Sequence, residues 1–367
     1  MSASQGLRLI FTVTTDLNYD QRMQRICSSL AEAGFDVWLV GRVKPGSQIL
    51  QSRPYKQIRL RCLFSKGKWF YFEFNLRLFL FLLLNKCRLI CGVDLDTALA
   101  AKWAAGIKGV PFVYDAHEYF TEIPELVDRP GIKRIWKGIE KKVVKTGLKA
   151  YTVSQSLADV FFEVYRVRFE VIRNTSVKSD SPSPLEKENY IIYAGAVNLG
   201  RGLEELIDVM PELETRLLIC GEGDLLPQLR SKVKSLHLEQ KVQFLGFVRP
   251  EELRRLTEKA KVGYLMLSFQ GLSYYHSLAN KFFDYMHAGT PQITINFPEY
   301  ALINREYEVG LLCPLDRQQI LQKLKRLLED QALYEQLRSN ALKAADEYNW
   351  QNESRKLIHF YQELTRN

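Results

Sequence analysis

The chain has 367 residues, of which 46% are apolar and 25% are charged. This composition is ordinary for a globular protein and excludes the disordered, collagen-like and coiled-coil classes. At roughly 100–200 residues per domain, the length favours two domains. The net charge of +9 is uneven: residues 1–180 hold 28 Lys and Arg against 17 Asp and Glu, and residues 181–367 hold 23 against 25. A basic half suggests an anionic partner such as phosphate, anionic lipid or nucleic acid.

The six cysteines are scattered and show neither a disulfide framework nor a zinc-site spacing, so we expect reduced thiols. The N-terminus does not resemble a signal peptide. The longest apolar run, residues 78–84, is far shorter than the ~20 residues that cross a bilayer. We therefore expect a cytoplasmic protein, either free or held at the inner face of the cell membrane.

Short β-branched or aromatic runs alternate with amphipathic segments along the first half. The expected strands are residues 7–13, 36–41, 88–93, 111–115, 150–154 and 169–173, and the expected helices are 21–34, 70–86, 96–107 and 131–147. This alternation predicts βαβ units, a parallel sheet and helices on both faces.

Two of these helical segments raise the question of a membrane surface. Residues 70–88 are apolar all round, which predicts a buried helix. Residues 132–145 place an apolar stripe among lysines, so this face either lies on anionic lipid or is solvated.

A stretch rich in Ser, Pro and charge, residues 176–189, predicts a linker. The strand and helix signals then restart, so we expect domains at residues 1–175 and 190–346. The last helix, 347–367, either caps the second domain or crosses back to the first. The predicted fold class is α/β: two Rossmann-like domains facing across a cleft, with C-terminal helices.

The second half holds a glycine-rich loop, residues 195–206, between an expected strand and helix. Gly195 and Gly202 allow tight turns, and the N–H groups at the helix start favour an anion. Arg201 adds a cation where a diphosphate would sit. A plain loop with a solvated arginine explains the same residues equally well.

Residues 276–291 form a second motif. We expect a helix from about Leu278, with Ser277 as its N-cap and with Asn280 and Lys281 in its first turn. A lysine there opposes the helix dipole, which suggests a bound anion. Asp284 is placed to accept hydrogen bonds from two adjacent sugar hydroxyls. An ordinary amphipathic helix is the simpler alternative.

Four motifs occur in order: the glycine-rich loop with Arg201-Gly202, GEGD at 221–224, VQFLGFV at 242–248 and SLANKFFDYMHAGTPQI at 277–293. In this order and spacing they resemble the retaining glycosyltransferases of family 4, whose fold is the two-domain GT-B fold.

The resemblance implies a role for several of these residues. Arg201 would hold the donor diphosphate, and Asn280 and Lys281 would approach its phosphates. Asp284 would bind the ribose of the nucleotide. The turn beside the base would be Leu245, Gly246 and Phe247.

The sequence departs from the family pattern at two positions. His276 stands where the first acid of the acid-x7-acid motif is usual, and Ala196 stands where an arginine is usual. Both departures are tolerable if Ser277 and backbone amides compensate, but they leave the identity of the donor sugar open.

The first half supplies further candidates. Asp115, His117 and Glu118 follow the strand at 111–115, and polar residues at this end of a parallel strand face the cleft. His117 matches the cleft histidine of the family, which resembles a contact to donor sugar and phosphate more than a general base.

The segment 14–26 takes the place of the family's acceptor loop, although it lacks a glycine pair. The acceptor-side candidates within it are Asp16, Asn18, Tyr19 and Arg22. Asp20 fits the role of a helix N-cap as well as that of a ligand contact, so it is left out of this set.

The resemblance thus implies a retaining, metal-independent transfer of a sugar from a nucleotide-diphosphate donor to an acceptor hydroxyl, with no cofactor. The acceptor is unspecified, with a lipid-linked sugar among the candidates and cell-surface polysaccharide or glycolipid assembly as the setting. No suitably placed D-x-D motif is apparent, and Arg201, Lys281 and helix N-termini would stabilise the leaving diphosphate without a metal.

Three alternatives stay open. The first is a nucleotide-sugar epimerase of the same fold, which acts without an acceptor. The second is a non-catalytic subunit that retains the fold, and His276 at the usual position of an acid is consistent with it. A dehydrogenase is disfavoured because no G-x-G-x-x-G follows the first strand. Apart from these three, nucleic-acid binding is a weak explanation of the basic first half, because basic and aromatic residues are not interleaved on one element.

Overall fold

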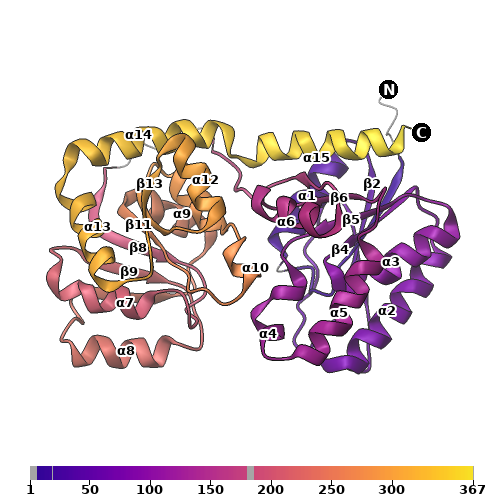
Figure 1. Cartoon of the computed structure of the whole chain (residues 1–367), viewed down its shortest axis with the longest axis horizontal. Helices are drawn as coiled ribbons and strands as arrows, with labels where there is room; N and C mark the ends of the chain where they lie inside the picture. Colours follow the sequence, from indigo (N-terminus) through magenta and orange to yellow (C-terminus); the bar gives the residue numbers. More distant parts are fainter. Residues whose placement is uncertain (1–5, 19, 180–185, 367) are drawn as a thin grey trace. The chain divides into compact units, whose positions relative to one another are not determined.

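A computed structural model describes residues 6–18, 20–179 and 186–366. The chain divides into two units (Figure 1). Unit 1 comprises Met1–Arg173 and Glu353–Asn367, and unit 2 comprises Asn174–Asn352. Each unit is a parallel β-sheet with flanking helices, which confirms the predicted α/β class with two Rossmann-like domains.

The sheet of unit 1 has seven parallel strands in the order β3-β2-β1-β4-β5-β6-β7. They are β1 (Arg8–Thr12), β2 (Asp36–Arg42), β3 (Lys56–Leu60), β4 (Leu89–Val93), β5 (Phe112–Ala116), β6 (Lys149–Thr152) and β7 (Glu170–Val171). β1 is central and pairs through Leu9 with Val37 of β2 and Leu89 of β4. We did not predict the edge strand β3. Three of the five residues in its sequence, KQIRL, are polar, and none of the five is fully buried.

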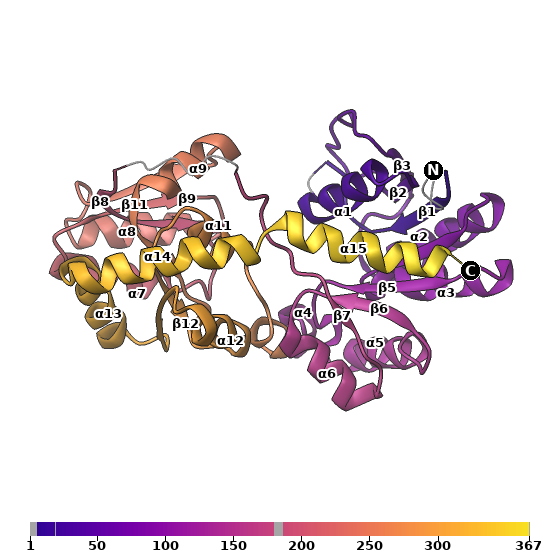
Figure 2. The same cartoon turned by 90° about the horizontal axis from the view of Figure 1, so that it is seen from above.

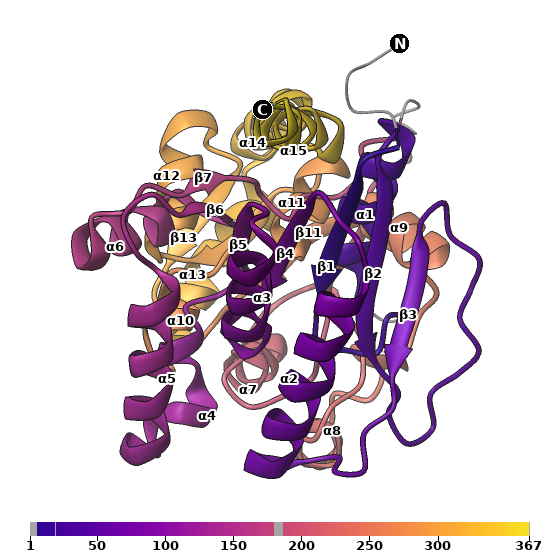
Figure 3. The same ribbon diagram turned by 90° about the vertical axis from the view of Figure 1, so that its right-hand side faces the viewer.

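Helices cover both faces of this sheet. They are α1 (Gln21–Glu32), α2 (Gly67–Leu84), α3 (Leu95–Lys108), α4 (Pro124–Val127), α5 (Pro130–Val143), α6 (Gln155–Tyr165) and most of α15 (Trp350–Thr365), with a 3-10 turn at Phe120–Glu122. Figure 3 shows α2, α3 and α5 side by side over one face. Figure 2 shows α15 running along the strands of unit 1. On this helix, the Tyr361 ring lies 5.5 Å from that of Phe11 and 6.3 Å from that of Tyr151. The last helix therefore completes the core of unit 1.

The prediction that residues 70–88 form a buried helix is wrong in part. One stripe of α2 is buried: Phe70, Phe74, Leu78 and Leu82. The opposite stripe is exposed to solvent: Trp69, Phe72, Leu76, Leu80 and Leu84. The sequence misleads here because a helix that is apolar all round gives no periodic signal for which face is covered.

The sheet of unit 2 has six parallel strands in the order β10-β9-β8-β11-β12-β13. They are β8 (Glu188–Ala194), β9 (Arg216–Cys220), β10 (Val242–Gly246), β11 (Ala260–Leu265), β12 (Gln292–Ile295) and β13 (Gly310–Cys313). The helices are α7 (Leu203–Val209), α8 (Leu226–Ser235), α9 (Pro250–Lys259), α10 (Leu272–Tyr275), α11 (Asn280–His287), α12 (Pro298–Tyr307), α13 (Arg317–Glu329) and α14 (Gln331–Glu347), with a 3-10 turn at Met210–Glu212. Asp316 and Asp330 cap α13 and α14 through their side chains, as acids at N-caps do.

The expected linker, residues 176–189, is shorter in the structure. Its first residues belong to unit 2, because the Ser176 hydroxyl donates to Asp284 and the Lys178 ammonium pairs with Asp346. Its last residues, from Glu188, already lie in β8. Of the remainder, residues 180–185 lie outside the described part of the chain.

Candidate functional site

In each sheet the strand order reverses at one point. The reversal lies between β1 and β4 in unit 1 and between β8 and β11 in unit 2. In open α/β sheets, ligands bind beyond the carboxyl ends of the strands at this topological switch point. Most predicted site residues of both halves follow strands at or next to these points, and Leu245–Phe247 lie at the end of the edge strand β10. Each unit therefore has a candidate site at the carboxyl edge of its sheet.

In unit 2, the loop after β8 packs tightly on the loop after β9. The Gly195 N–H donates to the Cys220 carbonyl and the Val197 N–H donates to the Glu222 carbonyl, both at 2.9 Å. Gly221 has a φ of +152°, and a Cβ there would lie 1.8 Å from the Gly195 carbonyl oxygen. The GEGD motif therefore supports the glycine-rich loop by letting two backbones meet.

Gly202 ends this loop as the N-cap of α7, with a φ of +67°. A Cβ there would lie 2.7 Å from the Cβ of Met266. The Gly202 carbonyl accepts a hydrogen bond from the Tyr264 hydroxyl at 2.6 Å. The start of α7 is thus fixed against β11. The helix begins directly after Gly202, as the sequence predicted.

Arg201 lies in the loop before α7 and Lys281 lies in the first turn of α11, and both act on Tyr193. The Lys281 Nζ lies 3.7 Å from the centroid of the Tyr193 ring. The same Nζ lies 3.3 Å from where a Cβ of Gly195 would be, so the ammonium reaches the glycine-rich loop. The Arg201 guanidinium lies 5.3 Å from the Tyr274 ring and donates to the Tyr274 hydroxyl at 3.4 Å.

The two cations influence each other. Burial lowers the pKa of the Lys281 ammonium well below its ordinary value, and the positive charge of Arg201 lowers it further, with Asp284 opposing both. The positive charges of Arg201 and Lys281 repel each other, and an anion between them would relieve the repulsion. The carboxyl edge of this sheet is therefore suited to a phosphate-bearing ligand.

The second motif differs from its predicted form at its start. α11 begins at Asn280 with Ala279 as its N-cap, so Ser277 is not the cap that we expected. The Ser277 hydroxyl instead donates to the Tyr274 carbonyl at 2.7 Å, and His276 ends the short helix α10. Ser277 and Lys281 consequently do not share a helix face.

Two candidates of this motif contact the chain just after unit 1. The Asn280 side-chain oxygen accepts a hydrogen bond from the Asn174 amide at 2.8 Å, and the Asp284 carboxylate accepts one from the Ser176 hydroxyl. Leu245 and Phe247, the residues predicted to lie beside the base, are 41% and 75% exposed. Gly246 between them has a φ of +65°, which turns the chain at the end of β10.

In unit 1, His117 lies between two aspartates. Its Nε2 is 3.0 Å from the Asp115 carboxylate and its Nδ1 is 3.5 Å from the Asp94 carboxylate. The His117 backbone N–H also donates to Asp94 at 2.9 Å. Burial opposes protonation of the imidazole, but Asp115 and Asp94 outweigh it and raise the pKa of His117 to about 9. Burial raises the pKa of Asp94 itself to about 8, whereas the pKa of Asp115 is lowered, so Asp115 is the stronger charge partner of the ring, which is a cation at neutral pH.

Sequence reasoning missed Asp94 and Asp96, which follow β4. Asp94 has a φ of +53°, rare for a residue other than glycine and typical of functional sites. Burial raises the pKa of Asp96 to about 6, and its carboxylate accepts a hydrogen bond from the Thr14 hydroxyl at 2.5 Å. The signal was the sequence Asp94-Leu95-Asp96 directly after a strand, a D-x-D sequence that we did not count as suitably placed. Among the described residues, no group of His, Cys, Asp or Glu has the geometry to hold a metal ion.

Arg22 lies inside unit 1, not at its surface. Its guanidinium donates to the Asp115 carboxylate at 3.0 Å and to the Ile172 carbonyl at 3.3 Å. The Arg22 side chain is 5% exposed. This places Arg22 behind His117, where it helps to fix Asp115, and differs from the acceptor contact that we expected. Glu118 is half-buried, and its pKa is raised by burial.

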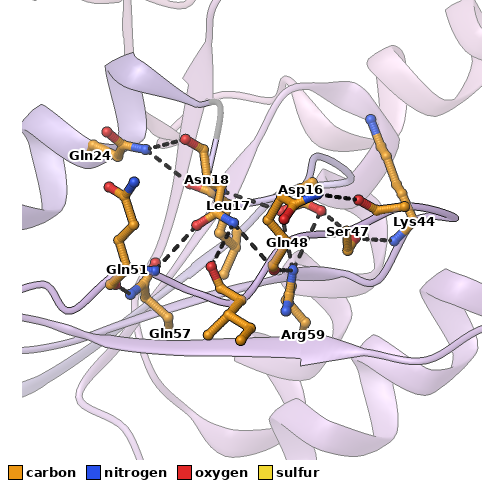
Figure 4. Close-up of polar contacts among 12 residues, drawn as sticks. Asp16, Leu17, Asn18, Gln24, Lys44, Ser47, Gln48, Gln51, Gln57 and Arg59 are labelled. Carbon is orange, nitrogen blue, oxygen red and sulfur yellow. Dashed lines mark hydrogen bonds and ion pairs between the residues drawn. The ribbon is translucent and has the colours of Figure 1, made fainter.

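Asp16 and Asn18 hold a neighbouring loop in place (Figure 4). The Asp16 carboxylate accepts hydrogen bonds from the Ser47 hydroxyl and, at 3.4 Å, from the Arg59 guanidinium. The Asn18 amide donates to the carbonyls of Gln48 and Ile49 at 3.3 and 3.1 Å. Tyr19 lies outside the described residues.

Asp20, which we left out of the binding set, is the N-cap of α1. Its carboxylate accepts from the Met23 N–H at 3.0 Å.

Two family models together match most of the chain. The model of the glycosyl transferases group 1 matches residues 176–344, and the model of glycosyltransferase family 4 matches residues 21–175. Their boundary falls within two residues of the boundary between the units.

Curated relatives match smaller parts. An uncharacterized glycosyltransferase, MJ1607 of Methanocaldococcus jannaschii, is 27% identical over 182 residues, which are 48% of this chain and 45% of that protein. The O-antigen chain mannosyltransferase RfbU of Salmonella typhimurium is 32% identical over 126 residues, which are 33% of this chain and 36% of that protein. The chain thus matches less than half the length of either relative.

Among solved structures, HepE of Anabaena in complex with UDP is similar in fold. The TM-score is 0.77 at 13% identity, and the match covers 98% of this chain and 100% of that one.

Proposed function

The chain belongs to the family 4 glycosyltransferases with the GT-B fold, and we propose that it transfers a sugar from a nucleoside-diphosphate donor to an acceptor hydroxyl with retention of anomeric configuration. The observation that carries this proposal is the pair of cations at the carboxyl edge of the unit 2 sheet. The Lys281 ammonium lies on the Tyr193 ring, and the positive charge of Arg201 acts on it.

The leaving group of such a transfer is a diphosphate, whose negative charge grows as the bond to the sugar breaks. Arg201 and Lys281 would stabilise this charge by electrostatics that are in place before the reaction. The start of α7 and the Gly195–Gly202 loop would add backbone N–H groups. We propose that these groups serve in place of a metal ion. In a retaining transfer of this kind, an oxygen of the donor phosphate would take the proton of the acceptor hydroxyl.

For the nucleoside, we propose the positions that the resemblance assigned. Asp284 would accept hydrogen bonds from the ribose hydroxyls, and the exposed Leu245 and Phe247 would become covered by the base. The UDP complex of HepE supports a nucleoside diphosphate as the ligand class. Asp284 must then share its carboxylate between Ser176 and the ribose.

For unit 1, we propose that His117 contributes a fixed positive charge. Asp115 and Asp94 hold the ring as an imidazolium, which favours a contact to sugar oxygens or phosphate over the role of a base. The O-antigen relative supports polysaccharide or glycolipid assembly as the setting, and we propose work at the cytoplasmic face of the membrane. Among the described residues, no helix combines the length and apolarity needed to cross a bilayer.

The first test is ligand binding, measured by thermal shift and calorimetry against a panel of free nucleotides and nucleotide sugars. A ligand at 100 times its dissociation constant adds about 2.7 kcal/mol to the free energy of unfolding. Lys281→Ala and Arg201→Ala should each weaken binding of UDP, or of whichever nucleoside diphosphate responds, by about 10- to 100-fold, because a charged hydrogen bond is lost.

Lys234→Ala is the matched control, since Lys234 is an exposed cation of unit 2 on α8. No response to any ligand of the panel, or equal binding by the Lys281→Ala protein, contradicts the proposal.

Two alternatives are separated by the products. An epimerase converts the donor sugar without an acceptor, which nuclear magnetic resonance of the donor detects. A non-catalytic subunit, favoured by His276 at the usual position of an acid, binds the nucleotide but turns over no donor in any mixture with acceptor lipids or glycans. A transferase moves labelled sugar to an acceptor, and chelation of divalent cations leaves the rate unchanged if no metal takes part.

A further inference from the structure

The layer formed by α2, α3 and α5 exposes many large apolar side chains. On α2, the exposed fractions are 57% for Trp69, 65% for Phe72, 48% for Leu76 and 50% for Leu80. These four residues recur at steps of three or four, so they form one stripe along the helix. Exposed apolar residues are common singly, but a contiguous stripe of this length marks a surface that contacts another body.

The stripe continues on the neighbouring helices. α3 exposes Trp103 at 56% and Ile107 at 68%, and α5 exposes Ile132 at 43% and Ile135 at 64%. α3 packs on both α2 and α5, and Tyr71 of α2 reaches Trp136 of α5 with ring centroids 5.5 Å apart. Figure 3 shows the three helices side by side on one side of unit 1. We call this surface the α2–α3–α5 face.

The α2–α3–α5 face is also strongly basic. Residues 61–88 hold six Lys and Arg against one acid, Glu73, which pairs with Arg77. Residues 129–145 hold seven against one, and two of the seven, Lys133 and Lys137, pair with Glu122. The acid of the second segment, Glu140, is buried and accepts a hydrogen bond from Tyr165 at 2.5 Å, so it adds little negative charge to the surface. Exposed cations on or beside the helices include Lys66, Lys68, Arg134, Lys141 and Lys142.

We propose that the α2–α3–α5 face lies on the surface of a bilayer rich in anionic phospholipid. Tryptophan and phenylalanine on an exposed helix enter the boundary between headgroups and acyl chains, and lysines beside them meet the anionic headgroups. Lys68 illustrates the arrangement, because its ammonium lies 5.6 Å from the Trp69 ring at the start of α2. Contact is at the surface, since no described helix is suited to crossing the membrane.

A second copy of this chain fits the face less well. A symmetric dimer would place the same patch against itself. The basic segments on both sides of the apolar stripe would then meet like charges, which is unfavourable. An anionic membrane satisfies the apolar stripe and the cations together. This inference does not depend on the proposed sugar transfer, because it rests on exposed side chains of α2, α3 and α5 and is tested without substrate.

The test is sedimentation of the full chain with vesicles of phosphatidylcholine alone or mixed with phosphatidylglycerol. The protein should bind the mixed vesicles and bind the neutral ones much more weakly. Leu76→Ser combined with Leu80→Ser should lower the affinity for mixed vesicles by at least about tenfold, because apolar area is lost from the lipid boundary. Lys141→Glu combined with Lys142→Glu should lower it by roughly a hundredfold, because each charge near an anionic surface contributes.

Matched controls keep the experiment interpretable. Val164→Ser with Leu236→Ser removes exposed apolar side chains elsewhere, and Lys234→Glu with Lys343→Glu reverses exposed charges on unit 2. Both control proteins should bind vesicles like the unaltered chain, and all variants should keep its unfolding midpoint.

Three results overturn the proposal. They are absence of binding to mixed vesicles, equal binding to both vesicle types, and binding that survives in both test variants. Dimers in sedimentation velocity that disappear in the Leu76→Ser, Leu80→Ser protein would assign the face to a second copy instead.

Discussion

The carboxyl edges of the two sheets share one architecture and have opposite chemistry. In unit 1 this edge carries Asp94, Asp96, Asp115 and Glu118 around His117. In unit 2 it carries glycines and two cations, Arg201 and Lys281. Parallel strands and the switch point set where a ligand binds, but the loop residues set its charge. The comparison shows that the same fold, used twice, prepares one edge for hydroxyl-rich groups and the other for an anion.

Breaking the charge network of unit 1 should have the largest effect. Asp115→Asn leaves the buried Arg22 guanidinium without a charged partner and removes the closer carboxylate from His117. We expect a loss of about 3–5 kcal/mol in the free energy of unfolding of unit 1. Four of the five tryptophans, at positions 38, 69, 103 and 136, lie in unit 1, so denaturant unfolding followed by tryptophan fluorescence measures this loss.

Asp36→Asn is the control, because Asp36 pairs with Arg8 at 2.7 Å but is 36% exposed. Its loss should stay below about 1 kcal/mol. Equal losses in the two variants would mean that burial does not strengthen the network.

The pH dependence of unit 1 should be the next largest effect. The pKa of His117 is raised to about 9 from an ordinary value of about 6.5. Its contribution to stability is therefore fully present below pH ~6.5 and is lost as the pH rises through about 9, up to about 3 kcal/mol. The difference in unfolding free energy between the unaltered chain and His117→Gln should shrink over this interval. The same measurement on His359→Gln, at an exposed position of α15, should show no such change.

The smallest expected effect concerns proton uptake in unit 2. The pKa of Lys281 is lowered by burial and by Arg201, and a bound diphosphate would raise it again. At alkaline pH, where UDP is fully ionised, binding should take up as much as one proton, and the affinity should fall by up to tenfold per pH unit. Calorimetry in two buffers of different ionisation enthalpy measures the uptake. Uptake that persists in Lys281→Ala would assign it to another group and weaken the contrast between the two edges.

Much of this arrangement was predictable from the sequence. The hydrophobic pattern marks the strands, and residues that directly follow a parallel strand lie at its carboxyl end. The runs at 7–13 and 88–93 predict β1 and β4, and residues placed directly after strands, such as His117 and Arg201, lie at the carboxyl edges. Gly202 was recognisable because a helix start in the left-handed region favours glycine.

The remaining features depend on tertiary contacts that local patterns do not encode. Ser277 has the residue type of an N-cap, but it follows the short helix α10, which ends at His276. The next helix, α11, begins only at Asn280, three residues after Ser277. Arg22 looked like a surface cation until the fold placed Asp115 beside it. Asp94 was missed because its contact with His117 joins two strands that are neighbours in space and 23 residues apart in sequence.

The meeting of two backbones at Gly221 has a consequence for sequence variation. With a Cβ position 1.8 Å from the carbonyl oxygen of Gly195, even alanine requires both loops to shift together. Random replacement at this codon followed by selection for folded protein should return glycine alone. The same close contact restricts movement of the loop that carries Arg201.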